Sequence, residues 1–307
     1  MKNAKEKLLQ ERFRLLLDDY ERFFEYSQKP LRKSLRVNTL KTTRKELEAS
    51  MQQQNFTLRA IPWAGDGFWV EGNGLSETVD YFLGRYYIQE SSAMLPAQLL
   101  QPGEKDAVLD VAAAPGGKTT HLAALMNNYG CIAANEINKQ RRAALRFNLS
   151  KYGVLNAAVT AVDFSRPVSC RERFSRILLD APCSCEGQFR KKTPAREQWS
   201  PAKILACSRL QKKMIASALR LLDAGGVLVY STCTLAPEEN EEVVDYALRN
   251  NDDLTVEPVG KQDFNYRRGV TSWNGKDYSP EVKNCVRVYP QDNDSEGSFI
   301  GKIVKGK

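Results

Sequence analysis

Two cysteines follow apolar runs that are typical of buried strands. Cys183 lies in RILLDAPCSCEG, close behind Asp180, and Cys233 lies in GVLVYSTCT. The carboxyl ends of parallel strands meet at one edge of a sheet, so these side chains are expected to share a cleft. A thiolate there can act as a nucleophile, and a neighbouring carboxyl group can give or share a proton. The pattern predicts covalent catalysis.

A third motif, VLDVAAAPGGKTTHL, spans residues 108–122 and reads as a strand, a turn of small residues and a helix. Small residues let the backbone approach a ligand, and the helix N-terminus offers free N–H groups. Glu136, 20 residues after Gly116, ends the next strand, where a carboxylate can bind ribose hydroxyls. Asp163 follows AAVTAV and could accept from an adenine amino group. Together they predict a nucleoside cofactor.

The same turn also resembles a phosphate-binding P-loop. Residues 112–119 match G-x-x-x-x-G-K-[ST] except at Ala112, and ILLD at 177–180 could serve as the second NTPase motif. However, Pro115 removes an N–H from the loop, and a phosphate site has no use for Glu136. The dinucleotide pattern G-x-G-x-x-G is absent from the turn. S-adenosylmethionine is therefore favoured over ATP and over a nicotinamide cofactor.

Thiols beside a methyl donor have a specific use. Carbon 5 of cytosine is a poor nucleophile, and addition of a thiolate at carbon 6 converts the ring to an enamine-like species that can attack a methyl sulfonium. Asp180 is placed to assist at N3. The remaining cysteines outside the Pro-Cys motif are expected to be structural: Cys131, Cys170, Cys207 and Cys285.

The elements that position these motifs indicate two units. From residue 91 to 307, strand runs alternate with helical stretches at 119–128, 139–152, 204–222 and 238–250, and an antiparallel pair comes last, near CVRVYP and SFIGKIV. This order predicts an α/β fold with a Rossmann-like, mostly parallel sheet. Residues 1–90 begin with an amphipathic helix that ends before Pro30, followed by a small α+β unit. That unit carries Lys33, Arg36, Lys41, Arg44 and Arg59.

Composition narrows the class of protein. The chain has 307 residues and a formal charge of +8, which favours a polyanionic partner. No run of about 18 apolar residues predicts a membrane span, and no signal core is seen. Seven cysteines without a disulfide framework predict a reducing cytoplasm. A metal site is not expected, because Cys183 and Cys185 form a lone pair and His121 is the only histidine.

The motifs PCSCEG, STCTLAPEENEEVV, DVAAAPGGKT, SLRVNTLK and SEGSFI resemble the Sun/NOP type of RNA (cytosine-5) methyltransferases, most like the short archaeal tRNA enzymes. The resemblance runs from about residue 31 to 303. It implies a class I S-adenosylmethionine-dependent fold with a seven-stranded sheet and an RRM-like N-terminal unit. It implies that Cys233 is the nucleophile, that Cys183 assists product release and that Asp180 contacts cofactor and base. The implied cofactor residues are Ala112, Ala113, Ala114, Pro115, Gly116, Gly117, Lys118, Glu136, Asp163 and Asp180.

Some positions depart from the common family pattern. Ala112 stands where the family often has Cys, and Lys192 belongs to a basic pair followed by Thr-Pro instead of Asp-Pro. Lys192 and Pro182 are expected to contact the target nucleotide. We expect a monomer that acts on tRNA, with rRNA as the alternative. A P-loop NTPase, a non-catalytic RNA-binding protein, and a DNA methyltransferase with Cys183 as nucleophile remain other possible classes.

Overall fold

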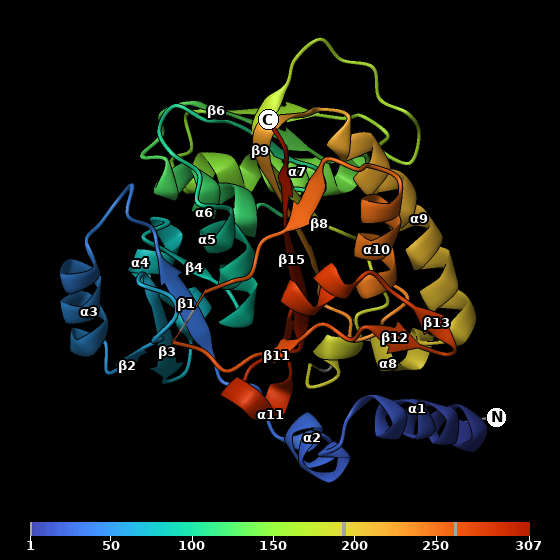
Figure 1. Cartoon of the computed structure of the whole chain (residues 1–307). Helices are drawn as coiled ribbons and strands as arrows, with labels where there is room; N and C mark the ends of the chain where they lie inside the picture. The colour runs from blue at the N-terminus through green and yellow to red at the C-terminus, as the bar shows by residue number, and fades with distance from the viewer. Residues whose placement is uncertain (1, 192–194, 261–262) are drawn as a thin grey trace.

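A computed structural model describes residues 2–191, 195–260 and 263–307 (Figure 1). In this part of the chain the larger sheet has nine strands, in the order β11-β14-β15-β9-β8-β5-β6-β7, with β10 pairing with β15. Five neighbouring strands are parallel: β5 (Ala107–Asp110), β6 (Cys131–Asn135), β7 (Ala157–Thr160), β8 (Phe174–Asp180) and β9 (Leu222–Thr232). The Rossmann-like prediction is confirmed.

The last strands change direction. β15 (Ser298–Lys305) pairs antiparallel with β9 and with β14 (Val286–Val288), which confirms the late antiparallel pair. These two and the five parallel strands make up the seven expected. The short strands β10 (Leu254–Val256) and β11 (Arg267–Arg268) extend the sheet and were not predicted, because two or three residues give no alternating pattern. β12 (Ser272–Trp273) and β13 (Lys276–Asp277) form a separate hairpin.

Helices cover both faces of the sheet because successive strand residues point in opposite directions. Leu178 packs in the core beneath α5 (Leu95–Leu100) and α6 (Gly117–Leu125), and α7 (Lys139–Lys151) lies beside α6. Leu179 packs beneath α9 (Pro201–Leu219) and α10 (Glu241–Arg249), on the right of Figure 1. The remaining helices of this part are short: α8 (Ala195–Gln198), α11 (Pro290–Asn293) and the 3₁₀ turns Ser92–Met94, Glu186–Gln188 and Pro280–Asn284. Within the described residues, none of the helices has the length and apolarity that a membrane span requires.

The small α+β unit of residues 34–88 lies to the left in Figure 1 and has its own antiparallel sheet, ordered β2-β3-β1-β4. With two helices inserted, this is the β-α-β-β-α-β arrangement of RRM-like domains. α3 begins where Thr43 and Glu46 form a reciprocal capping box. The elements are β1 (Ser34–Val37), α3 (Arg44–Gln53), β2 (Thr57–Ala60), β3 (Gly67–Glu71), the 3₁₀ turn Leu75–Glu77, α4 (Val79–Phe82) and β4 (Tyr86–Ile88).

The prediction of one continuous first helix is wrong. The segment forms α1 (Lys2–Leu16) and α2 (Tyr20–Gln28), and the chain turns at Asp19, whose carboxylate accepts two hydrogen bonds of 2.7 Å from Arg267. Both helices pack on the part of the chain that follows residue 90. Their apolar faces meet Trp199 and Leu235 in one cluster with Phe13, Leu17, Tyr20, Phe23 and Tyr289.

Arg36, one of the basic residues of the N-terminal unit, does not lie on its surface. It is buried, and its guanidinium donates to Gln89 Oε1 at 2.9 Å, to the Gly117 carbonyl at 3.1 Å and to Thr120 Oγ1 at 2.8 Å. Burial lowers the pKa of Arg36 to about 10. This arginine therefore joins the N-terminal unit to α6.

Candidate active site

A cleft of about 470 Å³ opens at the carboxyl ends of β5, β6, β8 and β9. Ligands bind at this edge of open α/β sheets because the loops there are free to converge. The cleft is lined by residues from both cysteine motifs, from the turn after β5 and by the two acids predicted beyond it: Ala112, Ala114, Glu136, Asp163, Asp180, Pro182, Cys183 and Cys233. The other predicted cofactor residues are not among its lining residues: Ala113, Pro115, Gly116, Gly117 and Lys118.

The turn after β5 forms part of the wall of the cleft. Gly116 has φ +111°, which favours glycine, and α6 begins directly after it. A Cβ at Gly117 would lie 3.3 Å from the Tyr87 ring, so the small residue there makes room for the N-terminal unit. Ala113 is buried against Leu145. The small residues of the turn therefore serve packing as well as ligand approach.

Glu136 follows β6 and presents a buried carboxylate to the cleft. Its Oε1 accepts from the Asn138 backbone N–H at 2.8 Å. Its Oε2 lies 3.2 Å from Arg141 Nη1, but has no hydrogen bond of good geometry in the described part of the chain. A buried oxygen without a donor is costly unless a ligand satisfies it. Asp163 lies across the cleft, and the Ser165 hydroxyl at 2.6 Å helps to lower its pKa.

Asp180 ends β8 and is held on both sides. Its Oδ2 accepts from Lys118 Nζ at 2.6 Å, and its Oδ1 accepts from Ser231 Oγ at 2.9 Å. Burial disfavours the charged form of Lys118, but the Asp180 carboxylate outweighs burial and raises the lysine's pKa. Lys118, which the P-loop alternative assigns to phosphate, is instead part of an ion pair at the cleft.

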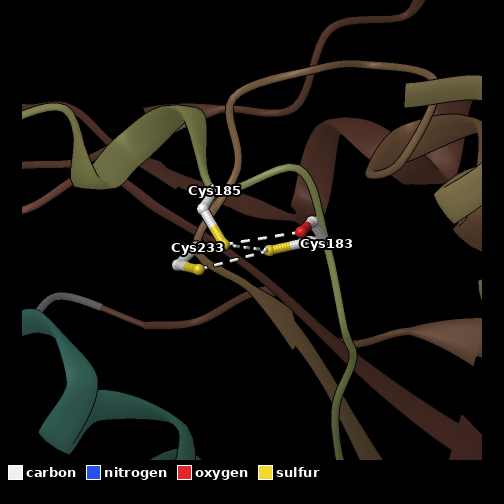
Figure 2. A group of neighbouring side chains, drawn as sticks. All are labelled: Cys183, Cys185 and Cys233. Atoms are coloured by element: carbon white, nitrogen blue, oxygen red, sulfur yellow. Dashed lines mark hydrogen bonds between the residues drawn. The ribbon is translucent and has the colours of Figure 1, made fainter. Parts of the chain in front are cut away.

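Figure 2 shows three sulfur atoms that point toward one another. Cys183 Sγ lies 3.2 Å from Cys233 Sγ and 3.9 Å from Cys185 Sγ, and all three atoms lie within 4.8 Å of one another. The loop after β8 turns back at Cys185, which has φ +63°. The structure confirms that Cys183 and Cys233 converge, and it adds Cys185, which the sequence pattern placed only next to Cys183.

The three thiols titrate as a group. Hydrogen bonds from Cys183 and then Cys233 lower the pKa of Cys185. The Cys185 and Cys233 thiols, together with burial, raise the pKa of Cys183. For Cys233, the contact with Cys183 lowers the pKa, whereas Cys185 and burial raise it. The net effect is a raised pKa of Cys233. The cluster therefore ionises one thiol at a time.

Glu239 connects the two cysteine loops and was missed from the sequence, where it lies in the acidic run PEENEE. It is fully buried. Its carboxylate accepts from the Ser184 backbone N–H at 3.0 Å, from Gln211 Nε2 at 2.9 Å and from the Ser184 hydroxyl. Ser184 Oγ also contacts Thr234 Oγ1 at 2.8 Å. One buried carboxylate thus fixes both loops.

Pro182 lines the cleft, and its carbonyl accepts from Gln211 Nε2 at 2.9 Å. Lys192, the other predicted nucleotide contact, lies outside the described residues. Of the cysteines expected to be structural, Cys285 is buried, whereas Cys131 and Cys170 are exposed. Assigning these two cysteines to a strand or a loop was not enough to predict whether their thiols are buried.

Two sequence families match the chain. The family described as 16S rRNA methyltransferase RsmB/F matches residues 97–304, and the N-terminal domain of 16S rRNA methyltransferase RsmF matches residues 6–91. The chain belongs to this methyltransferase family. It is an RNA methyltransferase with the class I fold, and the resemblance drawn from its cysteine motifs is confirmed. The family match accounts for the turn at residues 112–119, so the alternative of an NTPase that binds ATP there is not required.

The names of individual relatives refer to different kinds of RNA. The chain is 44% identical over 94% of its length to the tRNA (cytosine(49)-C(5))-methyltransferase of Pyrococcus abyssi, covering 93% of that protein. It is 41% identical to ribosomal RNA small subunit methyltransferase F of Serratia proteamaculans, and spans 60% of that protein's length. A crystal structure of a methyltransferase homologue from Pyrococcus horikoshii superposes with a TM-score of 0.84 at 37% identity, over 94% of this chain and 91% of that one.

Proposed function

We propose that this enzyme transfers a methyl group from S-adenosylmethionine to carbon 5 of a cytosine in tRNA, through a bond between Cys233 and carbon 6. The observation that carries the proposal is the 3.2 Å contact between the sulfur atoms of Cys183 and Cys233. The two residues follow the carboxyl ends of the adjacent strands β8 and β9, beside Asp180. A single thiol would serve addition. A second thiol in contact with it supplies a group for the reverse step.

The cleft fits the proposed methyl donor. Glu136 Oε2, which lies near Arg141 but accepts no hydrogen bond in the described structure, suits a ribose hydroxyl. Asp163 suits an adenine amino group, and the small side chains of Ala112 and Ala114 leave room for the donor. Bound there, S-adenosylmethionine supplies an electrophilic methyl group. Glu136, Asp163 and the turn would hold it in the cleft that Cys183 and Cys233 also line.

The protein residues then act in order. The Cys233 thiolate forms a bond to carbon 6, and the electron pair of the 5,6 double bond moves toward carbon 5 and N3. Asp180 shares a proton with N3 as charge develops, and its ion pair with Lys118 provides the source. Carbon 5 gains the methyl group. Carbon 5 then loses its proton to water as the bond between carbon 6 and Cys233 breaks, which restores the 5,6 double bond, and N3 returns its proton to the Asp180–Lys118 pair. Cys183 gives a proton to the departing Cys233 sulfur and regains one from water.

tRNA is favoured as the substrate because the tRNA relative has the higher identity and is matched over nearly all of its length. The formal charge of +8 suits a folded RNA. We also propose that the enzyme acts as a monomer, and that it acts in the cytoplasm, a location that the seven free cysteines support.

Bisulfite sequencing tests the proposal directly. Purified protein is incubated with S-adenosylmethionine and either tRNA or 16S rRNA, and protected cytosines are mapped. We expect protection at a defined cytosine of tRNA and none in rRNA. Protection in rRNA alone would leave the chemistry intact and replace the substrate, whereas methyl transfer without bisulfite protection would rule out carbon 5 as the acceptor.

A further inference from the structure

Cys183, Cys185 and Cys233 form a cluster of three thiols, one more than the proposed methylation mechanism uses. Its sulfur atoms lie 3.2 Å and 3.9 Å apart for the two measured pairs, and all fall within 4.8 Å. Two sulfur ligands at about 2.3 Å from one tetrahedral zinc ion lie roughly 3.8 Å apart. The three thiols therefore match the face of a tetrahedral thiolate site with small side-chain movements.

The backbone around the cluster is fixed, which lowers the cost of assembling such a site. Glu239 holds the loop of Cys183 through Ser184, and the Gly187 N–H donates to the Cys233 carbonyl at 2.9 Å, which ties the end of that loop to the second cysteine. A Cβ at Gly187 would lie 2.2 Å from the Gly297 carbonyl oxygen, so the approach is as close as glycine allows. The sulfur ligands are presented together before any ion arrives.

The cluster is also reachable and chemically selective. All three cysteines line the cleft, and none forms a disulfide in the described structure. Asp180, the cleft carboxylate three residues before Cys183, is already paired with Lys118. A site made only of thiolates selects thiophilic ions such as Zn²⁺ over hard ions such as Mg²⁺. Three protein ligands leave a fourth coordination position open to water or another ligand.

We propose that Cys183, Cys185 and Cys233 form a Zn²⁺-binding site that competes with catalysis. Coordination replaces the thiol protons and withdraws the lone pair of Cys233 from reaction with carbon 6. Cys185, which the methylation mechanism does not use, is the residue that converts a pair of catalytic thiols into a three-ligand site. The inhibitory part rests on the proposed function, whereas ion binding does not.

The full-length protein is titrated with Zn²⁺ by calorimetry, with a non-thiol reductant that keeps the cysteines reduced. The variants Cys183→Ser, Cys185→Ser and Cys233→Ser are compared with Cys170→Ser, which removes an exposed thiol elsewhere. We expect one ion per wild-type chain, affinity at least about tenfold lower in each cluster variant, and no change in Cys170→Ser. Cd²⁺ then reports the number of bound thiolates by its charge-transfer absorption, and three are expected in the wild type.

Equal Zn²⁺ affinity in Cys185→Ser and Cys170→Ser would overturn the proposal, as would fewer than three thiolates bound to Cd²⁺ in the wild-type protein. The Cd²⁺ measurement keeps the test valid if a variant misfolds. In the methylation assay, Zn²⁺ should inhibit the wild type at concentrations at which Cys185→Ser stays active. Absence of any methyl transfer before zinc is added would count against the proposed function, not against the ion site.

Discussion

The Ser184 backbone N–H donates to the Glu239 carboxylate at 3.0 Å, so a residue just before α10 fixes the loop that carries Cys183. The same carboxylate takes the Ser184 hydroxyl and the Gln211 amide. It lies in the chain only a few residues after Cys233. The spacing of the Cys183 and Cys233 thiols is therefore expected to depend on one buried acid that does not line the cleft.

Replacing Glu239 tests this role. Glu239→Ala leaves buried donors of Ser184 and Gln211 without an acceptor, so the free energy of unfolding should fall by about 2 to 4 kcal/mol, and kcat should fall at least about tenfold. Glu239→Gln keeps one acceptor and should lose less. Urea unfolding and the methylation assay give the two readouts. Glu257→Ala, which removes an exposed glutamate paired with the partly buried Lys302, is the control, and its free energy of unfolding should stay within about 1 kcal/mol of the wild type. Unchanged kcat in Glu239→Ala would show that the loops hold their spacing without it.

The two cysteines should fail in different ways. Cys233→Ala should abolish methyl transfer and leave S-adenosylmethionine binding intact, because the thiol reacts only with the base. Cys183→Ala should trap the RNA on Cys233 and give a slowly migrating band on a denaturing gel. The band should be absent from the double variant. Trapping by Cys233→Ala instead would make Cys183 the nucleophile, as in DNA methyltransferases, and full activity in both single variants would remove the covalent mechanism.

Glu136 should control affinity for the methyl donor. Loss of a buried charged hydrogen bond corresponds to at least about a tenfold change in binding, so calorimetry should show this weakening in Glu136→Ala. ATP should not bind to either protein. Glu104→Ala removes an exposed glutamate and is the matched control, with unchanged affinity expected. Tight ATP binding would revive the P-loop interpretation of residues 112–119.

RNA binding should depend on salt through the exposed basic residues of the N-terminal unit. Lys33, Lys41 and Arg59 are exposed, and a triple alanine variant should lower the slope of log affinity against log salt by about one for each phosphate that the variant no longer neutralises. Lys105→Ala with Lys307→Ala is the control. An unchanged slope would place the RNA surface on the catalytic part. Deletion of residues 1–90 is a poorer test, because α1 and α2 fill the cluster around Trp199 and Leu235.

Asp110 should make stability depend on pH. Burial raises its pKa to about 7 from an ordinary 3.8, and its Oδ1 has no hydrogen-bond partner among the described residues. The folded state therefore binds the proton more tightly, and this stabilisation is lost as the pH rises through about 7. Between about pH 5.5 and 8.5 the wild type should lose roughly 2 kcal/mol more than Asp110→Asn in urea unfolding. Exposed Asp252→Asn should behave like the wild type; equal pH dependence in Asp110→Asn would contradict the prediction.

The sequence predicted those elements of the fold whose residues form a recognisable pattern over neighbouring positions. The apolar runs of β5, β8 and β9 and the turn at residues 112–117 follow from periodicity, and they place Asp180, Cys183 and Cys233 at one edge of the sheet. Leucine spacing continues through Leu16 and Leu17, so periodicity does not reveal the break at Asp19, which depends on Arg267. Cys185 and Glu239 acquire their roles from partners 48 and 55 residues away, beyond any local pattern.

Arg36 has a consequence for how such enzymes can be recombined. Its guanidinium satisfies a carbonyl and a hydroxyl in the first turns of α6 while it lies in β1 of the N-terminal unit. A chimaera that exchanges residues 1–90 for a different module would remove the hydrogen bonds from Arg36 to the Gly117 carbonyl and the Thr120 hydroxyl, next to the turn before α6. Modular exchange at this boundary therefore requires the incoming module to bring an arginine at the same place, or α6 to be redesigned with it.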